Sequence, residues 1–405
     1  MIVQENQENI FKLENSSNKF LIVEKREIKE EDEDEDINEN FGFQEISFKE
    51  LYIKDNLFRH VIEHINKYLS KNNSNSPDDI ITKNIKNITE FIKQNKFTED
   101  ILEIILLHGI PNNLQCLRPL IWKSFLNYFP RNDLSKWKTI TYRSYKLYQQ
   151  IENKYPQYPL DITDPVDQKI VTQLEKDLPR TRADIIFFKN LTNSKKNKNE
   201  THYDVIKRML FYFAKEYSIS YVQGMNEIIS LIYYIFANDD NPFSKKYLES
   251  DTYFCFIKLM DEIKDVFLIN NISYSKLFIT QEISQINDIL EKIEPDLMNF
   301  FKEIDFSIDS FVIRWIMVLF AQEFKIDIAV SFWDRMFTQR NKMNFICFIA
   351  AAIFQLNKDK IIGKELEDIC EWTKQMGNNI NKMDINEIIL FAFAIKKKYK
   401  ELIEK

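Results

Sequence analysis

The chain has 405 residues, of which 44% are hydrophobic and 14% aromatic, and this is enough apolar material for one or two packed cores. Its formal charge of −7 and its isoelectric point near 5.5 argue against a nucleic-acid partner, because binding to phosphate backbones normally depends on clustered Lys and Arg. The longest uninterrupted apolar run, residues 345–354, is well short of the roughly 18 to 20 residues that span a bilayer. We therefore expect a soluble or peripheral protein that binds no nucleic acid.

The first 45 residues are polar and contain an acidic run, Glu30–Asp36. Such a run repels itself and offers little apolar surface to offset the entropy lost on ordering. We therefore expect a disordered acidic tail over residues 1–45. A solvated tail is the simpler interpretation, and a docking site for a basic partner is the alternative.

From Phe48 onward apolar residues recur at three- and four-residue spacing, which predicts a helical N-terminal extension over residues 46–108. His60 and His64 lie one helical turn apart within it. The zinc-protease pattern requires Glu directly after the first His, but the chain has Val61 there and no third ligand nearby. No metal site is therefore expected.

From residue 109 to the C-terminus, long helical patterns alternate with short polar breaks. Sustained β-type alternation bounded by Asn-Gly or Asp-Gly turns is absent, so we expect an all-α protein. Residues 155–166, with three prolines, and the Lys/Asn-rich residues 190–201 are predicted to be surface loops. Three apolar stripes mark helices: Val205, Ile206, Met209, Leu210 and Phe213; Ile313, Ile316, Met317 and Phe320; and Val330, Trp333 and Phe337.

The cysteines and glycines exclude several kinds of site. The four cysteines are far apart and form no CxxC pair, which argues against a zinc ribbon or a disulfide framework and indicates a reducing compartment, the cytosol. Only five glycines occur, and none belongs to a GxxxxGK[ST] or GxGxxG phosphate-binding loop. The chain is therefore not expected to bind a nucleotide of its own.

Four short segments carry the most specific signals, and each alone is common by chance. They are Gly109-Ile110-Pro111 with Leu117-Arg118-Pro119 and Trp122, then Leu174 to Thr181, then Tyr221-Val222-Gln223-Gly224-Met225, and finally Ser331-Phe332-Trp333-Asp334-Arg335. Their order and spacing resemble the TBC domain family over about residues 109–401. Within that family, the runs 221–237, 251–260 and 314–324 resemble the member-13 subgroup.

This resemblance implies an all-α, two-lobed, V-shaped TBC helical domain over residues 109–405 that acts on a Rab-family small GTPase. The expected activity is GTPase activation in membrane trafficking, in which the protein contributes residues to the GTPase's active site and is not itself an enzyme. GTP and Mg²⁺ are then held by the partner, so no cofactor of its own is expected. The chain shows no lipidation motif, and we expect a cytoplasmic protein recruited peripherally to endomembranes by the GTP-bound Rab.

The resemblance also implies the site residues. Arg180 matches the arginine finger of the family, and Gln223 matches the glutamine that positions the attacking water. The chemistry agrees, because a guanidinium stabilises charge on the γ-phosphoryl oxygens and an amide both donates and accepts hydrogen bonds. Asp177 either holds the Arg180 guanidinium by a charge-assisted hydrogen bond or simply caps a helix. The other supporting residues are Thr181, Tyr221 and Gly224.

Two positions depart from the family motif. Leu174 stands where Ile is usual, which preserves volume. Ala183 stands where proline is common, and Arg182 before it is a second cation that could compete for the phosphates; the spacing from Asp177 favours Arg180 as the finger. Large aromatic and charged residues of the other segments are expected to be mainly structural: Arg118, Trp122, Trp315, Trp333 and Asp334.

Two other functions remain as alternatives. A TBC-fold protein could bind a Rab without activating it, as a scaffold or effector, although the presence of both fingers favours the activator. A helical adaptor with no GTPase partner predicts that Arg180 and Gln223 are buried or point apart, whereas activation requires both to be exposed on one side of a shared groove. A hydrolase is disfavoured because the chain lacks a GxSxG nucleophile motif.

Overall fold

The structure is a computed structural model that describes residues 105–110, 116–131, 133–155, 163–192, 199–217, 220–239, 241–267, 272–380 and 382–404. Within these ranges the regular structure is helical, apart from one isolated bridge between Leu191 and Thr201. The prediction of an all-α protein is confirmed. The predicted tail lies outside the described residues, as does the predicted extension except for residues 105–108, which are helical.

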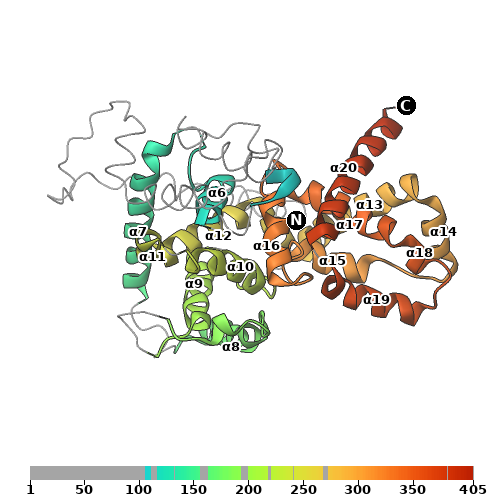
Figure 1. The fold of residues 1–405 in the computed structure, drawn as a ribbon. Helices are drawn as coiled ribbons and strands as arrows, with labels where there is room; N and C mark the ends of the chain where they lie inside the picture. The colour runs from blue at the N-terminus through green and yellow to red at the C-terminus, as the bar shows by residue number, and fades with distance from the viewer. Residues whose placement is uncertain are drawn as a thin grey trace, which may run out of the picture.

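The helices form two groups along the chain, shown on either side of α16 in Figure 1. The first group is α6 (Arg118–Phe125), α7 (Trp137–Lys154), α8 (Pro165–Asp177), α9 (His202–Glu216), α10 (Met225–Ala237), α11 (Pro242–Lys246) and α12 (Leu248–Ile263). The second is α13 (Ile272–Ile293), α14 (Pro295–Glu303), α15 (Asp309–Met317), α16 (Ile326–Met336), α17 (Lys342–Leu356), α18 (Lys358–Ile361), α19 (Leu366–Asn379) and α20 (Lys382–Ile403). Short 3₁₀ helices are η3 (Leu134–Lys136), η4 (Leu178–Arg180), η5 (Ile186–Lys189) and η6 (Lys264–Phe267).

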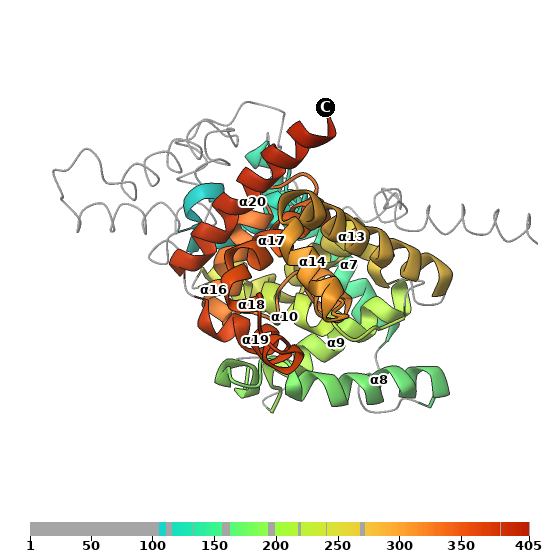
Figure 2. The ribbon, with the colours of Figure 1, turned by 90° about the vertical axis from the view of Figure 1, so that its right-hand side faces the viewer.

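In the first group α10 packs against α12 and α9, and α12 packs against α7. In the second group α17 is central and packs against α13, α15 and α20. Figure 2 turns this second group toward the viewer and leaves α8 along the lower edge. The V shape itself stays a prediction. None of the helices in the described ranges is both long and apolar enough to cross a bilayer.

Two helix starts follow from local sequence. Asp164 caps α8 by accepting a hydrogen bond from the backbone N–H of Val166 at 2.6 Å, and Pro165 takes the first helical position, where a missing N–H costs nothing. The surface loop predicted over residues 155–166 therefore ends earlier than expected, because its last proline begins a helix. At α9, Thr201 and Asp204 form a capping box.

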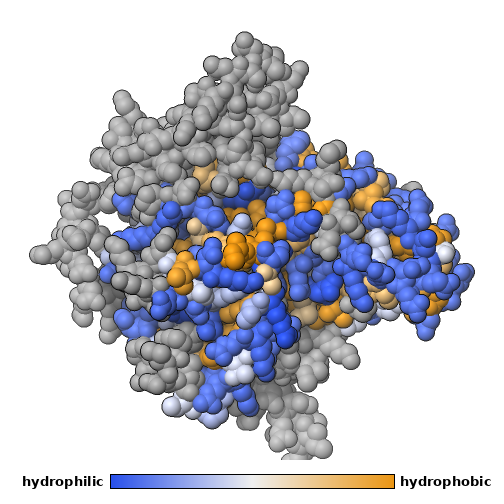
Figure 3. All heavy atoms as spheres, turned by 60° about the horizontal axis from the view of Figure 1, so that its bottom comes forward, coloured by the Kyte–Doolittle hydropathy of each residue, from blue (hydrophilic) through white to orange (hydrophobic). Residues whose placement is uncertain are grey.

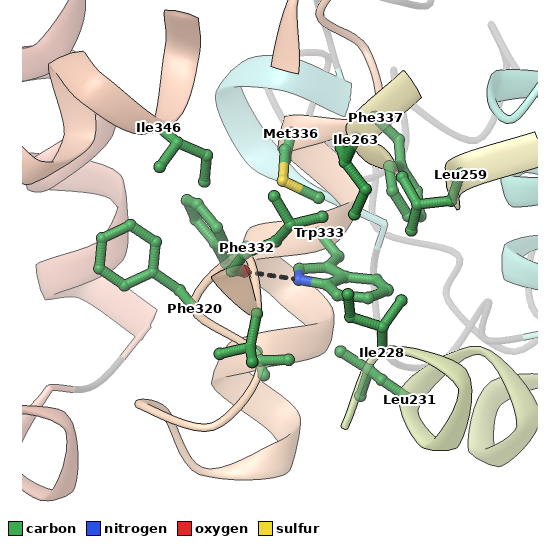
Figure 4. Close-up of a cluster of buried hydrophobic side chains, with 14 of the residues drawn as sticks. Ile228, Leu231, Leu259, Ile263, Phe320, Phe332, Trp333, Met336, Phe337 and Ile346 are labelled. Carbon is green, nitrogen blue, oxygen red and sulfur yellow. Dashed lines mark hydrogen bonds between the residues drawn. The ribbon is translucent and has the colours of Figure 1, made fainter. Parts of the chain in front are cut away.

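Helix α16 is one of the elements that join the second group to the first. Figure 4 shows Trp333 of α16 lying against Ile228 and Leu231 of α10, with Leu259 of α12 close by. The indole Nε1 of Trp333 donates to the Leu319 carbonyl oxygen at 2.9 Å, drawn there as a dashed line. This packing fixes the turn after α15 relative to α10, and both elements reappear in the candidate site.

A buried polar cluster around Asp334 joins the first motif segment to the last. The Asp334 carboxylate accepts hydrogen bonds from Arg118 Nε at 3.0 Å, Trp122 Nε1 at 2.8 Å and the Ile110 backbone N–H at 3.2 Å. These side chains, together with Trp333 and Trp315, are buried, as the structural role expected for them requires. A negative charge with three donors around it is well compensated in a buried place.

Candidate functional site

Arg180 ends η4, directly after α8. Pro179 lacks an N–H and favours the tighter turn, and the Thr181 N–H closes it by donating to the Asp177 and Leu178 carbonyl oxygens at 3.1 and 3.0 Å. The Arg180 side chain is exposed, and it makes no hydrogen bond or ion pair with another described residue. The turn therefore fixes the backbone of Arg180, while its guanidinium is open to solvent.

Gln223 occupies the turn that leads into α10, and its side chain is also exposed. Gly224 follows it with φ +107°, a left-handed conformation that disfavours any residue with a Cβ. A Cβ at this position would lie 3.2 Å from Val318 Cγ1, so the backbone also approaches a neighbouring segment closely. Gly224 thus allows the sharp turn that carries Gln223.

Hydrogen bonds tie the Arg180 segment to the Gln223 segment. The Tyr221 hydroxyl donates to Asp177 Oδ2 at 2.9 Å and lies 3.0 Å from Asn226 Oδ1. Asn226 Nδ2 donates to Thr181 Oγ1 at 2.7 Å, and Asn226 Oδ1 accepts from the Gly224 N–H at 2.8 Å. Buried residues next to Arg180 and next to Gln223 thus hold the two segments together by hydrogen bonds.

Asp177 has different partners from those expected. Its buried carboxylate accepts from Tyr221 and from Gln173 Nε2 at 3.0 Å; it has no contact with the Arg180 guanidinium among the described residues and makes no helix-capping hydrogen bond. Burial, reinforced by the Asp177 charge, raises the pKa of Tyr221 well above its usual range, so the hydroxyl keeps the proton that it donates. Asp177 therefore joins the two segments instead of holding Arg180 directly.

Asn226 is the buried polar residue that sequence reasoning missed. It lies one residue into α10, a helix that is otherwise largely apolar, and it is 4% exposed. A buried amide requires hydrogen-bond partners for both its donor and its acceptor groups. An asparagine at the start of so apolar a helix, three residues after Gln223, was the available signal.

Arg182, the competing cation, points into the protein. The Arg182 backbone has φ +48°, and the side chain is buried. Nη1 donates to the Phe324 carbonyl oxygen at 2.6 Å, and Nε lies 3.9 Å from Glu227 Oε2, an ion pair too long for a hydrogen bond. Arg180 is therefore the exposed cation of residues 178–185, which we call the finger loop after its candidate finger.

The environment of Glu227 is the most perturbed of the carboxylates beside the finger loop. Burial raises the pKa of Glu227 to about 7; the nearby Arg182 charge opposes the rise, while Asp184, Asp177 and Glu323 add to it. Near neutral pH this carboxyl is consequently part protonated. It lies in the first turn of α10, four residues after the exposed Gln223.

The side of the molecule on which α8 lies carries both polar and hydrophobic residues at its surface. Figure 3 views the molecule from the side on which α8 lies in Figure 1 and shows hydrophobic residues gathered among polar ones. On η5, just after the finger loop, Ile186 is 68% exposed. Among the described residues, no group of three His, Cys, Asp or Glu could hold a metal ion.

Comparisons with known proteins agree with the motifs. The model of the Rab-GTPase-TBC domain matches residues 115–362, a stretch that includes Arg180 and Gln223. The chain is 26% identical over 364 residues to TBC1 domain family member 13 of Homo sapiens, covering 69% of this chain and 90% of the relative. It is 26% identical over 257 residues to the GTPase-activating protein GYP1 of Saccharomyces cerevisiae, covering 58% of this chain and 36% of that protein.

Among solved structures, the fold is similar to the Ypt/Rab-GAP domain of Gyp1p. The TM-score is 0.66 at 21% sequence identity, and the match covers 79% of this chain and 99% of that domain. At this identity the likeness concerns the fold alone.

Proposed function

Because the chain belongs to the Rab-GTPase-TBC domain family, we propose that it accelerates GTP hydrolysis by a GTP-bound Rab-family GTPase through Arg180 and Gln223. The observation that carries the proposal is the placement of these two residues. Both are exposed, and hydrogen bonds between Tyr221 and Asp177 and between Asn226 and Thr181 join the segments that carry them. The helical-adaptor alternative expected the two side chains to be buried or apart.

The proposed role of Arg180 is electrostatic. During phosphoryl transfer, charge is spread over the γ-phosphoryl oxygens, and a permanently charged planar guanidinium can contact two of them at once. Fingers of this kind are worth about 10³ to 10⁵ in rate, or roughly 4 to 7 kcal/mol of transition-state stabilisation. The unpartnered side chain of Arg180 needs to break no bond to a described residue before it enters the GTPase.

The proposed role of Gln223 is to orient the attacking water. Its amide can accept a hydrogen bond from the water and donate one to another oxygen of the site. The GTPase holds GTP and Mg²⁺, so the chain supplies side chains to a site that it does not itself contain. We further propose that the protein acts in the cytoplasm and is recruited peripherally to endomembranes by its GTP-bound Rab partner.

The test is single-turnover GTP hydrolysis by a panel of GTP-loaded Rab proteins. Wild type, Arg180→Lys and Gln223→Ala are compared, with Arg143→Lys as the matched control because Arg143 is exposed on α7, away from the finger segments. We expect at least one Rab to respond to wild type and to the control, and to lose most of the acceleration with either finger variant. A Rab that binds in its GTP form without any acceleration would support the scaffold alternative.

A further inference from the structure

Arg182 is a second arginine two residues after Arg180, but its side chain is buried in the protein. It is 9% exposed, whereas Arg180 is exposed, and only Thr181 separates them. The backbone turns at Arg182 with φ +48°, a conformation that costs a residue with a Cβ about 1 kcal/mol or more. Something in the folded protein must offset that strain.

The Arg182 guanidinium reaches a distant segment of the chain. Nη1 donates a 2.6 Å hydrogen bond to the Phe324 carbonyl oxygen, 142 residues away in the sequence. Nε faces Glu227 at the start of α10 at 3.9 Å. One side chain therefore bridges the finger loop, α10, and the turn between α15 and α16.

The acceptor lies on a rigid turn. Leu319 and Phe320 both have positive φ values, and the turn is held by the Trp333 indole on the Leu319 carbonyl and by the stacked rings of Phe320 and Phe324, whose centroids are 5.4 Å apart. The carboxylate of Glu323 is ion-paired with Arg314. A hydrogen bond to such a turn restricts the motion of the donor, because the acceptor carbonyl cannot move with it.

We infer that Arg182 is a positioning residue that locks the finger loop, residues 178–185, against the turn between α15 and α16 and so presents Arg180 beside Gln223. The loop has other contacts: Thr181 bonds to Asn226, and the Thr181 carbonyl accepts from Tyr203 at 2.6 Å. Those contacts hold its first half. Arg182 makes a hydrogen bond that carries the loop to the second helical group. Its catalytic consequence rests on the proposed function.

The first measurement needs no GTPase. Hydrogen exchange is followed by mass spectrometry on the full chain, for peptides that cover the finger loop and for distant peptides of α17. In Arg182→Gln we expect exchange in the finger loop to rise about 10- to 100-fold, as loss of a charged hydrogen bond predicts, with α17 unchanged. Arg182→Lys keeps a cationic donor and is expected to restore part of the protection. It also carries the test if Arg182→Gln does not fold.

The matched control is Arg208→Gln. Arg208 of α9 is also a largely buried guanidinium, and it is paired with Glu200 and Glu249. Its replacement should destabilise the protein, but these ion pairs do not involve the finger loop. If Arg208→Gln loosens the finger loop as much as Arg182→Gln does, or if Arg182→Gln leaves the loop's exchange unchanged, the inference is wrong.

The second measurement is kinetic, with any GTPase that responds to wild type. A misplaced finger should lower kcat by about 10- to 100-fold while KM for the GTP-loaded GTPase changes little, because Arg182 does not face the partner. A loss confined to KM would instead make Arg182 a contact residue and overturn the inference. If no GTPase responds to wild type, the proposed function fails, and the exchange measurement still decides the role of Arg182.

Discussion

Arg180 and Arg182 show how a single residue of spacing separates two roles for the same side chain. One guanidinium is exposed and makes no hydrogen bond to a described residue, and the other is buried against the Phe324 carbonyl oxygen. Local sequence does not distinguish them, since both follow Pro179 closely and both are cations. Arg182 is buried because its backbone is left-handed and because its guanidinium reaches the Phe324 carbonyl oxygen, far along the chain.

Glu227 leads to a prediction about pH. Its pKa is about 7 in the folded protein, above the ordinary value of 4.5, so the folded state binds the proton more tightly than the unfolded chain. Its contribution to the free energy of unfolding is therefore largest at acidic pH and is lost as the pH rises from about 4.5 to about 7, by an amount on the order of 3 kcal/mol. Urea unfolding of wild type and Glu227→Gln from pH 5 to pH 8 measures this.

The comparison with Glu227→Gln is needed because other groups titrate in the same range. Burial lowers the pKa of His202 to about 4, and that effect has the opposite sign, since stability is lost as the pH falls below about 6.5. The charges facing Glu227 are Arg182 and Asp184 of the finger loop, Asp177 of α8 and Glu323 of the turn. We expect wild type to lose stability relative to Glu227→Gln as the pH rises; parallel curves would show that the Glu227 pKa is not raised.

At the scale of elements, the candidate finger site lies where two helix ends meet a turn. The end of α8 tightens into η4, α10 begins at the left-handed Gly224, and the turn between α15 and α16 receives Arg182. The end of α19 lies against the same turn: a Cβ on Gly377 would lie 1.4 Å from the Glu323 carbonyl oxygen. Two backbones can approach so closely only where one residue is glycine.

Gly377→Ala therefore has to separate α19 from the turn. We expect the free energy of unfolding to fall by about 1 to 3 kcal/mol, as overpacking does, and exchange in the finger loop to rise because the Phe324 carbonyl moves with Glu323. Gly363→Ala is the comparison, since its φ of +79° adds strain but nothing lies within 4 Å of the new Cβ. If the two variants affect the finger loop equally, the close approach at Gly377 has no special role.

At the scale of the whole molecule, Asp334 joins segments more than 200 residues apart. Its carboxylate contacts Ile110, Arg118 and Trp122 of the first motif segment from its place on α16. Gly109 beside them has φ +67° and is covered by the Arg335 guanidinium, which lies 2.5 Å from the place a Cβ would take. The first and last motif segments are thus one structural unit.

Asp334→Asn should destabilise the entire domain. It leaves the buried Arg118 charge without its partner, a change that typically costs about 3 to 5 kcal/mol. The measurement is urea unfolding followed by both tryptophan fluorescence and circular dichroism, and the two transitions should shift together. Asp327→Asn, in the first turn of the same helix and exposed, is the control. A loss below about 1 kcal/mol for Asp334→Asn would mean that the cluster contributes little.

Much of this protein follows from its sequence alone. Helical periodicity was sufficient for the all-α class because apolar residues at three- and four-residue spacing can bury one face only as helices. The motif segments indicated the family and the two candidate fingers, because local turns such as Pro179-Arg180 and Gln223-Gly224 set which side chains project.

Only the tertiary structure decided how those fingers are held. Tyr221 donates to Asp177, the amide of Asn226 donates to Thr181, and Arg182 donates to the Phe324 carbonyl oxygen. Each of these contacts joins residues at least 44 positions apart, and no local propensity encodes such a distance. Burial is what makes them matter, since a polar group removed from water must find its partner wherever the fold places one.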